Sequence, residues 1–161
     1  MRIGIVSDSH GNTAMVLEAL DRLRERGIQT VLHCGDIDDA STVHLFEDFA
    51  THFVFGNCDS DRSGIRRAIA VAGLTLHEPF GKLELAGRKI AFLHGDDRSL
   101  FQEVEQSGIY DYLFYGHNHQ AAEHRTGKTH VINPGALHRA RPKTILVLDL
   151  ESGERDTVVV E

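Results

Sequence analysis

Five short apolar runs in this chain each stop at a turn that combines glycine with Asp, Asn or His. The runs have the length and composition of buried β-strands. The segments that follow them are Asp8-Ser9-His10-Gly11, Gly35-Asp36, Gly56-Asn57-Cys58-Asp59, His94-Gly95-Asp96 and Gly116-His117-Asn118-His119. In α/β sheets, ligands bind beyond the carboxyl ends of the strands. We therefore expect these strand ends to converge on one site.

The first half of the chain alternates between strand and helix patterns. Apolar runs predict strands at Ile3–Val6, 28–34 and 53–55. Helical spacing of apolar residues predicts helices at 12–27, 39–49 and 60–72. This half therefore has a βαβαβα order.

The second half is richer in strands. Three runs at 74–76, 82–85 and 89–93 lie close together and are punctuated by Gly81 and by Ala86-Gly87-Arg88, which predicts a hairpin-rich, antiparallel region. Further predictions are a helix at 98–107 and strands at 111–115, 121–125, 130–133, 144–150 and 158–160. The whole pattern favours an α/β protein with two packed sheets and helices outside. Without a repeat or linker, residues 1–161 are expected to form a single domain.

Charge and composition narrow the classes of partner. The 161-residue chain has a net charge of −7 and no basic stretch, which argues against a stable nucleic-acid partner held by phosphate contacts. A small anionic substrate held by metal ions stays compatible with this charge. No apolar run approaches the roughly 20 residues of a membrane span, and we expect no signal peptide. Cys34 and Cys58 are interpreted as reduced thiols of a cytoplasmic protein, although a disulfide stays open.

Seven side chains in the strand-end turns could bind metal: Asp8, His10, Asp36, Asn57, His94, His117 and His119. One zinc site needs about four ligands, so this set indicates two metals that share a bridging carboxylate. Two metals roughly 3.5–4 Å apart stabilise the entering and leaving oxygens of phosphoryl transfer. Ligands of this mixed O/N type suit Mn, Fe, Ni, Co or Zn. The residues alone therefore indicate metal-assisted hydrolysis at phosphorus.

The same ordered motifs resemble those of the calcineurin-like metallophosphoesterases, and Asn133-Pro134-Gly135 extends the match. The short chain resembles their small prokaryotic phosphodiesterase branch. The resemblance implies a four-layer αββα sandwich, in which two mixed β-sheets are flanked by helices, with a dinuclear centre for which manganese is favoured.

The resemblance also implies a ligand set for each metal. The first metal would be bound by Asp8, His10, Asp36 and His119. The second would be bound by Asp36, Asn57, His94 and His117. A hydroxide between the metals would attack phosphorus, so that Asp36, Asn57 and His94 would act in catalysis through the metals.

Two positions depart from the family pattern. Many members carry His where this chain has Cys58, and that His serves as a proton donor or phosphate contact. The general acid is therefore unassigned, with Cys58 and Asp59 as candidates. Ala136 stands where Ser is common in this branch, so one hydroxyl near the site is missing.

The sequence leaves several readings open. A phosphodiesterase acting on a small phosphate ester is favoured, and a phosphomonoesterase or nucleotide phosphatase on the same centre is the chemical alternative. A noncatalytic scaffold like the retromer subunit of this fold is the alternative of another class. A homo-oligomer also stays open. Seven further histidines are expected to be surface or structural residues: His33, His44, His52, His77, His124, His130 and His138.

Overall fold

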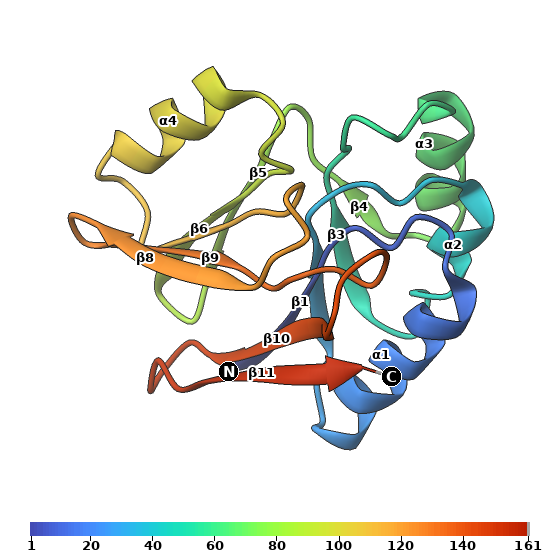
Figure 1. Cartoon of the computed structure of the whole chain (residues 1–161), viewed down its shortest axis with the longest axis horizontal. Helices are drawn as coiled ribbons and strands as arrows, with labels where there is room; N and C mark the ends of the chain where they lie inside the picture. Colours follow the sequence, from blue (N-terminus) through green and yellow to red (C-terminus); the bar gives the residue numbers. More distant parts are fainter. Residues whose placement is uncertain (161) are drawn as a thin grey trace.

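A six-stranded mixed sheet is built around the first strand of the chain. The computed structural model describes residues 1–160, and the last residue of the predicted domain, 161, lies outside them. The strands of this first sheet follow the order β11-β10-β1-β2-β3-β4 (Figure 1). Their bounds are β1 Arg2–Val6, β2 Thr30–His33, β3 Ala50–Phe53, β4 Thr75–Leu76, β10 Lys143–Asp149 and β11 Arg155–Val160. Strands β1 to β4 run parallel, and β10 pairs antiparallel with β1.

A second mixed sheet packs face to face with the first. Its strand order is β5-β6-β7-β9-β8. The bounds are β5 Gly81–Leu85, β6 Arg88–Phe92, β7 Tyr112–Phe114, β8 Ala122–Thr126 and β9 Thr129–Asn133. Strands β6, β7 and β9 are parallel, and the two edge strands pair antiparallel with their neighbours. The carboxyl ends of the central strands in both sheets therefore meet at one edge of the molecule.

Helices cover the outer faces of the two sheets. Helices α1 (Thr13–Glu25), α2 (Ala40–His44) and α3 (Arg62–Val71) lie on the first sheet, and α4 (Arg98–Gln106) lies on the second (Figure 1). This confirms the predicted four-layer αββα arrangement. None of the helices in the described part of the chain combines the length and apolar character that crossing a membrane requires.

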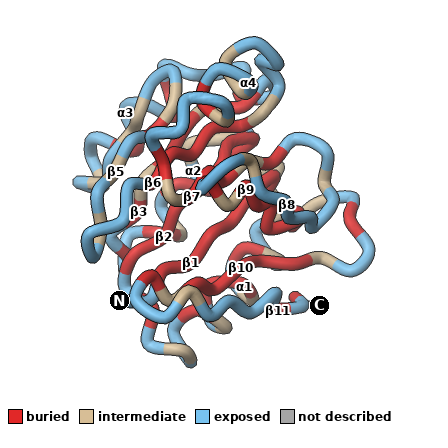
Figure 2. Tube along the Cα trace, turned by 90° about the vertical axis from the view of Figure 1, so that its left-hand side faces the viewer, coloured by how far each residue is buried: buried red, intermediate tan, exposed pale blue. Residues whose placement is uncertain are grey.

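Three apolar layers hold this arrangement together. Leu20 and Leu23 of α1 pack on one face of the first sheet, and α1 lies so close that a β-carbon at Gly4 would collide with Leu23. Ile3 and Ile5 point the other way and meet the second sheet, as the period-2 alternation of a strand requires. Val104 of α4 packs on the far side of that second sheet. Figure 2 shows the buried residues running through the middle of the molecule along β1 and β10.

Three predicted elements differ from the structure. Residues 74–76 do not belong to the antiparallel region, because β4 pairs in parallel with β3 at the edge of the first sheet. The predicted helix at 39–49 ends at His44 and continues as three-residue turns. In these turns the Phe46 carbonyl accepts from the Phe49 N–H at 3.0 Å and from the Thr51 hydroxyl at 3.3 Å. These are not the bonds of a regular α-helix, so the helix does not continue.

The third strand is also shifted from its predicted position. It was predicted at 53–55, but its ladder runs from Ala50 to Phe53. The Val54 N–H still donates to the His33 carbonyl at 3.2 Å, and Phe55 leaves the sheet. This departure frees Phe55 to line a cleft next to the strand ends.

Candidate metal centre

The ends of β1 and β2 are joined by backbone hydrogen bonds that bring two carboxylates together. The Asp8 N–H donates to the Gly35 carbonyl at 3.1 Å, and the His10 N–H donates to the Asp36 carbonyl at 3.0 Å. Asp8 and Asp36 therefore lie side by side where the parallel strands finish. Both side chains are buried, with exposed fractions of 0% and 2%.

Left-handed backbone is concentrated at the predicted metal ligands. Five of the seven have positive φ: Asp8 (52°), His10 (45°), Asp36 (56°), His117 (72°) and His119 (57°). Such conformations cost energy for residues other than glycine, and they cluster at functional sites where the surrounding structure enforces them. The turns thus orient these side chains toward one site and not toward solvent.

Asp8 carries a buried oxygen that is left for a ligand. Its Oδ2 atom accepts from the Ser7 hydroxyl at 2.6 Å and from the His117 N–H at 3.1 Å. Its Oδ1 atom lies 3.2 Å from Nε2 of His119 but has no hydrogen-bond partner among the described residues. A buried carboxylate oxygen without a partner is costly, so Oδ1 is suited to a cation.

Asp36 lies between two imidazoles. Its Oδ2 atom is 3.4 Å from Nε2 of His10 and 3.3 Å from Nε2 of His94, while Oδ1 accepts from the Cys58 N–H at 2.8 Å. Nε2 of His10 is buried and, within the described chain, forms no hydrogen bond. Burial by itself raises the pKa of Asp36, but its contacts with His94 and Cys58 outweigh burial and hold the pKa below its usual range. Asp36 is therefore an anion that contacts both halves of the site.

His94 is oriented by the backbone of β2. Its Nδ1 atom lies 2.9 Å from the Cys34 carbonyl, so Nδ1–H donates and Nε2 faces the site. Nε2 is 3.1 Å from Oδ1 of Asn57. Burial lowers the pKa of His94, but Asp36, Asp8 and the hydrogen bond to Cys34 together outweigh burial and raise the pKa to about 8. A metal bound here would displace the proton that Nε2 carries in its absence.

The turn after β7 brings the last two histidines to the site. The His117 N–H contacts Asp8, as described, and the His117 ring lies 5.1 Å from the His94 ring. The His119 ring lies 5.4 Å from the His10 ring. The structure therefore gathers all seven predicted side chains, which come from the turns after β1, β2 and β3 of the first sheet and after β6 and β7 of the second.

The donor set fits divalent metal ions. Asp8, His10 and His119 place three ligand atoms within 4.8 Å of one another, and so do Asp8, Asp36 and His94. These atoms are carboxylate oxygens and imidazole nitrogens, which suit first-row divalent metals. The two groups share Asp8, and Asp36 joins the second group to His10. The orphaned Oδ1 of Asp8 and Nε2 of His10 also gain a partner if a cation is present.

Cys58 lines the centre. Its Sγ atom lies within 4.8 Å of ligand atoms of His10 and Asp36. Burial, and then the neighbouring Asp36 carboxylate, raise the pKa of the thiol above its ordinary value. The thiolate is the form that binds metals, so at neutral pH Cys58 is a neutral neighbour of the centre.

Asp59 is engaged in holding two turns. Its Oδ1 atom accepts from the Ile37 and Asp38 N–H groups, each at 2.7 Å, and its Oδ2 atom accepts from the Gly56 and Asp36 N–H groups at 2.7 and 3.1 Å. Both oxygens are thus occupied by backbone donors. This arrangement is the geometry of a positioning residue rather than of the proton donor considered above.

The close approach of these turns also requires glycine. A β-carbon at Gly56 would collide with Oδ1 of Asp36.

Asn133 holds another turn of the site. The Asn133 amide donates to the Gly116 carbonyl and to Asn118 Oδ1, both at 2.9 Å. Asn133 therefore fixes the turn that carries His117 and His119.

Two of the histidines set aside in the sequence lie close to the centre. His33 is fully buried against Phe53, accepts the Gly35 N–H at Nδ1 and contacts the Ser9 hydroxyl at 2.9 Å through Nε2. It is structural, as expected. His138 lies 5.0 Å from the His10 ring, so it belongs to the surroundings of the centre. Its sequence context gave no signal for this, because the segment before it returns to the site only through the tertiary fold.

Comparisons with known proteins show which family the chain is related to. Residues 1–153 match the model of the calcineurin-like phosphoesterase superfamily domain. A phosphodiesterase of Methanocaldococcus jannaschii is 28% identical over 166 residues, covering 100% of both chains. A solved structure described as a novel archaeal phosphodiesterase has a TM-score of 0.91 at 28% identity and covers 99% of this chain and 100% of its own.

More distant structures share the fold. Vps29 of Entamoeba histolytica, solved with zinc, is 22% identical with a TM-score of 0.69 and covers 96% of this chain and 89% of its own. A phosphoesterase from E. coli is 19% identical with a TM-score of 0.71 and covers both chains fully. At these identities, the likeness supports the architecture alone.

Proposed function

Because this chain belongs to the calcineurin-like phosphoesterase superfamily, whose members are metal-dependent hydrolases of phosphoesters, we propose that it is a dinuclear phosphodiesterase acting on a small phosphate diester. The observation that carries the proposal is the pair of orphaned buried atoms, Oδ1 of Asp8 and Nε2 of His10, which lie in one group of candidate ligands beside the Asp36 carboxylate. Buried polar atoms without partners favour a site that is built to bind a cation.

We assign the ligands in two groups that share Asp36. Asp8, His10, Asp36 and His119 would bind the first metal. Asp36, Asn57, His94 and His117 would bind the second. Manganese is favoured among Mn, Fe, Ni, Co and Zn. When bound, two such ions activate water and stabilise charge on the oxygens of a phosphoryl group.

The residues of the chain have distinct tasks in this proposal. The Cys34 carbonyl holds His94 with Nε2 toward the site, and Asp59 keeps the turns that carry Asp36 and Asn57 together. Cys58, a neutral thiol beside Asp36, stands where many members of the family carry a His that serves as a proton donor or phosphate contact. A thiol whose pKa is raised is a weak acid, so the departing oxygen leaves largely without a proton from the protein.

Free cysteines fit the proposed cytoplasmic location. Cys34 is buried and Cys58 is exposed, and neither forms a disulfide. Thiols persist in this state in reducing compartments. We also propose that residues 1–161 form a single domain that holds no stable nucleic-acid partner.

Metal analysis followed by substrate turnover tests the proposal. The protein is stripped with a chelator, reloaded with each metal in turn and assayed with bis-(p-nitrophenyl) phosphate and p-nitrophenyl phosphate. We expect two metals per chain and faster turnover of the diester. Preference for the monoester would support a phosphomonoesterase instead, and metal binding without turnover of either ester would support a scaffold.

A further inference from the structure

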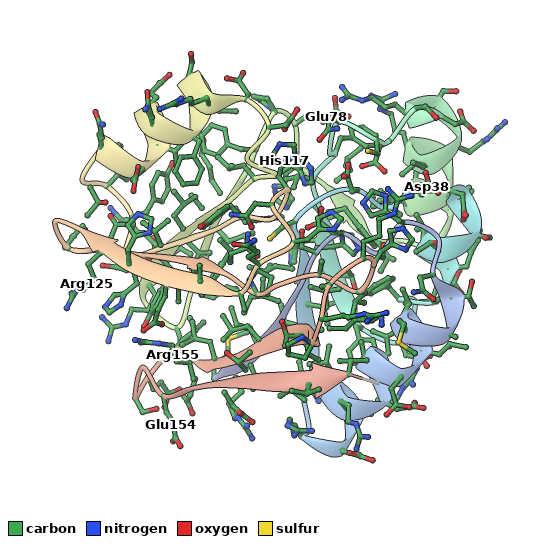
Figure 3. The ribbon with its side chains drawn as sticks, in the orientation of Figure 1. Asp38, Glu78, His117, Arg125, Glu154 and Arg155 are labelled. Atoms are coloured by element: carbon green, nitrogen blue, oxygen red, sulfur yellow. The ribbon has the colours of Figure 1, made fainter. Side chains whose placement is uncertain are left out.

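A cleft of about 400 Å³ opens directly beside the metal centre. Its lining includes Phe55 and Arg62, which follow β3, and Leu93 and Leu100, which follow β6. His94 belongs both to this lining and to the metal centre, so the two are continuous. Figure 3 shows Glu78, another residue of the lining, on the same side of the molecule as His117.

The cleft combines apolar and aromatic lining with an arginine. Phe55, Pro79, Leu93 and Leu100 supply the apolar surface. The guanidinium carbons of Arg62 and Arg66 lie 5.1 and 5.6 Å from the centre of the Phe55 ring, so two arginines from α3 already stack on this ring, and a ligand would meet the part of the ring that they leave uncovered. Flat rings and guanidinium planes both stack on flat ligands. A cleft of about this size, lined in this way, is typical of sites for small organic groups.

The charged groups of the cleft are not all neutralised by one another. Arg66 pairs with Glu78 at 2.8 Å, and Asp97 accepts the N–H groups of Ser99 and Leu100 at the start of α4. By contrast, Arg62 has no carboxylate partner in residues 1–160 and donates only to the Gly56 carbonyl, at 3.3 Å. This carbonyl directly precedes Asn57, a proposed metal ligand. Arg62 therefore lies on the side of the cleft next to the metal centre, where the phosphoryl group of a substrate would bind.

Asp96 provides the complementary free group. It is exposed, lines the cleft and has no hydrogen-bond or ion-pair partner in the part of the chain that the structure describes. A carboxylate accepts hydrogen bonds only, so it would recognise hydroxyl or amino groups on a ligand. The cleft thus offers a flat apolar surface, an acceptor and, toward the metals, a cation.

We propose that this cleft binds the nucleoside arm of a nucleotide phosphodiester. This rests on the proposed function and names its substrate class. The base lies against Phe55 and the apolar wall, Asp96 accepts from hydroxyl or amino groups of the nucleoside, and Arg62 contacts a phosphate oxygen that is not attacked. The fork of an arginine matches phosphate oxygens. The second ester arm is the leaving group and needs no contact with the cleft.

Two diesters with the same leaving group test this assignment. Thymidine 5′-(p-nitrophenyl) phosphate carries a nucleoside arm, and methyl p-nitrophenyl phosphate carries a methyl group in its place. We expect a KM at least about tenfold lower for the thymidine diester, as stacking of a base on aromatic side chains provides. The kcat values should be similar, because the departing oxygen is the same.

Variants assign this difference to the cleft. Phe55→Leu keeps an apolar side chain but removes the ring, and it should raise KM for the thymidine diester about tenfold and leave the methyl diester unchanged. Arg62→Gln should raise KM for both diesters. Arg67→Gln is the matched control, because Arg67 lies on the same helix, is exposed and does not line the cleft.

Binding without turnover gives an independent readout. Saturation-transfer NMR of thymidine 5′-monophosphate with the metal-stripped protein should show transfer to the base protons that is weakened in Phe55→Leu and retained in Arg67→Gln. Asp96→Ala, at an exposed position, removes both accepting oxygens and should weaken the same signal. This variant decides the question if Phe55→Leu proves unstable.

The outcomes separate the cleft from the proposed function. If both diesters are hydrolysed with equal KM values and the cleft variants change neither, the assignment of the cleft is overturned while the phosphodiesterase proposal stands. If neither diester is hydrolysed with any metal, the proposed function fails. The NMR result then still decides whether the cleft binds a nucleotide.

Discussion

Oδ1 of Asp8 lies 3.2 Å from Nε2 of His119, yet no hydrogen bond joins them and the oxygen is buried. Two such atoms, close together but not hydrogen-bonded to each other, are suited to bind the same metal ion. Oδ2 of Asp36 lies at a similar distance, 3.4 Å, from Nε2 of His10. Because Asp36 contacts both His10 and His94, it is the side chain on which the two proposed metal sites depend.

The first prediction concerns this shared carboxylate. Asp36→Asn should lose most of both metals, because a neutral amide cannot offset two dications. Asn57→Ala should lose mainly one metal per chain. Elemental analysis after dialysis against each metal measures both effects. Asp97→Asn, at the start of α4, is the control and should retain the parent metal content. Equal metal loss in Asp36→Asn and Asn57→Ala would contradict the shared role of Asp36.

The second prediction concerns Asp59. Asp59→Asn replaces one accepting oxygen with an amino group, so N–H groups of the Asp36 and Gly56 turns lose their partner. Each buried N–H left without a partner costs about 1–3 kcal/mol. We expect chemical denaturation of the metal-free variant to show a loss of stability of that order, together with weaker metal binding.

A matched control distinguishes this role from a general effect of losing a carboxylate. Asp61 caps α3 by accepting the Gly64 N–H at 2.9 Å. Asn caps helices about as well as Asp, so Asp61→Asn should change stability little. If both variants lost the same stability, the loss would be a general effect of removing a carboxylate and the positioning role of Asp59 would be contradicted. If Asp59→Asn abolished activity with stability and metal content intact, Asp59 would have a catalytic role instead.

The convergence of the predicted ligands on one site could be predicted because neighbouring parallel strands run in the same direction. Apolar runs that end in Asp8 and Asp36, read as neighbouring parallel strands, must finish at the same edge of a sheet. The four layers followed from the change in pattern near the middle of the chain. The partner of residues 74–76 was not predictable, because a two-residue strand carries no pattern that identifies its neighbour.

The surroundings of the site were less accessible to sequence reasoning. Asp59 binds backbone N–H groups 21 to 23 residues away, and such contacts leave no signature in residue type. The cleft is formed because Phe55 leaves the sheet one residue after Val54 and lines one cavity together with Leu100 from the other half of the molecule. His138 reaches His10 through the same tertiary packing.

The third prediction concerns the stability of the fold against acid. Burial lowers the pKa of His33 to about 3, below its ordinary value of 6.5. Between these values the unfolded chain binds a proton that the folded chain does not, so stability rises with pH across this window. The contribution is complete above about pH 6.5 and is lost as pH falls, by at most about 1.4 kcal/mol per pH unit for one group.

Denaturation of the metal-free protein at pH 7 and pH 5 measures this effect. His33→Gln removes the titrating group, so its loss of stability between pH 7 and pH 5 should be smaller than that of the parent by about 2 kcal/mol. His44→Gln, at an exposed position on α2, should behave like the parent. An unchanged pH dependence in His33→Gln would mean that His33 is not kept neutral by the fold.

The fourth prediction follows from the thiol beside Asp36. General acid catalysis typically contributes about 10²–10⁴-fold, and poor leaving groups depend on it most. Since Cys58 is a weak acid and Asp59 is occupied by backbone N–H groups, we expect fast turnover of aryl diesters and slow turnover of alkyl diesters. The measurement is kcat/KM against leaving-group pKa for a series of diesters.

Variants at position 58 test the cause of that slope. Cys58→His places a better proton donor beside Asp36 and should narrow the gap between aryl and alkyl diesters, with metal content checked because an imidazole can itself bind metal. Cys58→Ser is the control of similar size and should leave the slope as it is in the parent. A flat dependence in the parent would show that the departing oxygen already receives a proton. His138, which lies 5.0 Å from the His10 ring, would then be the residue to change next.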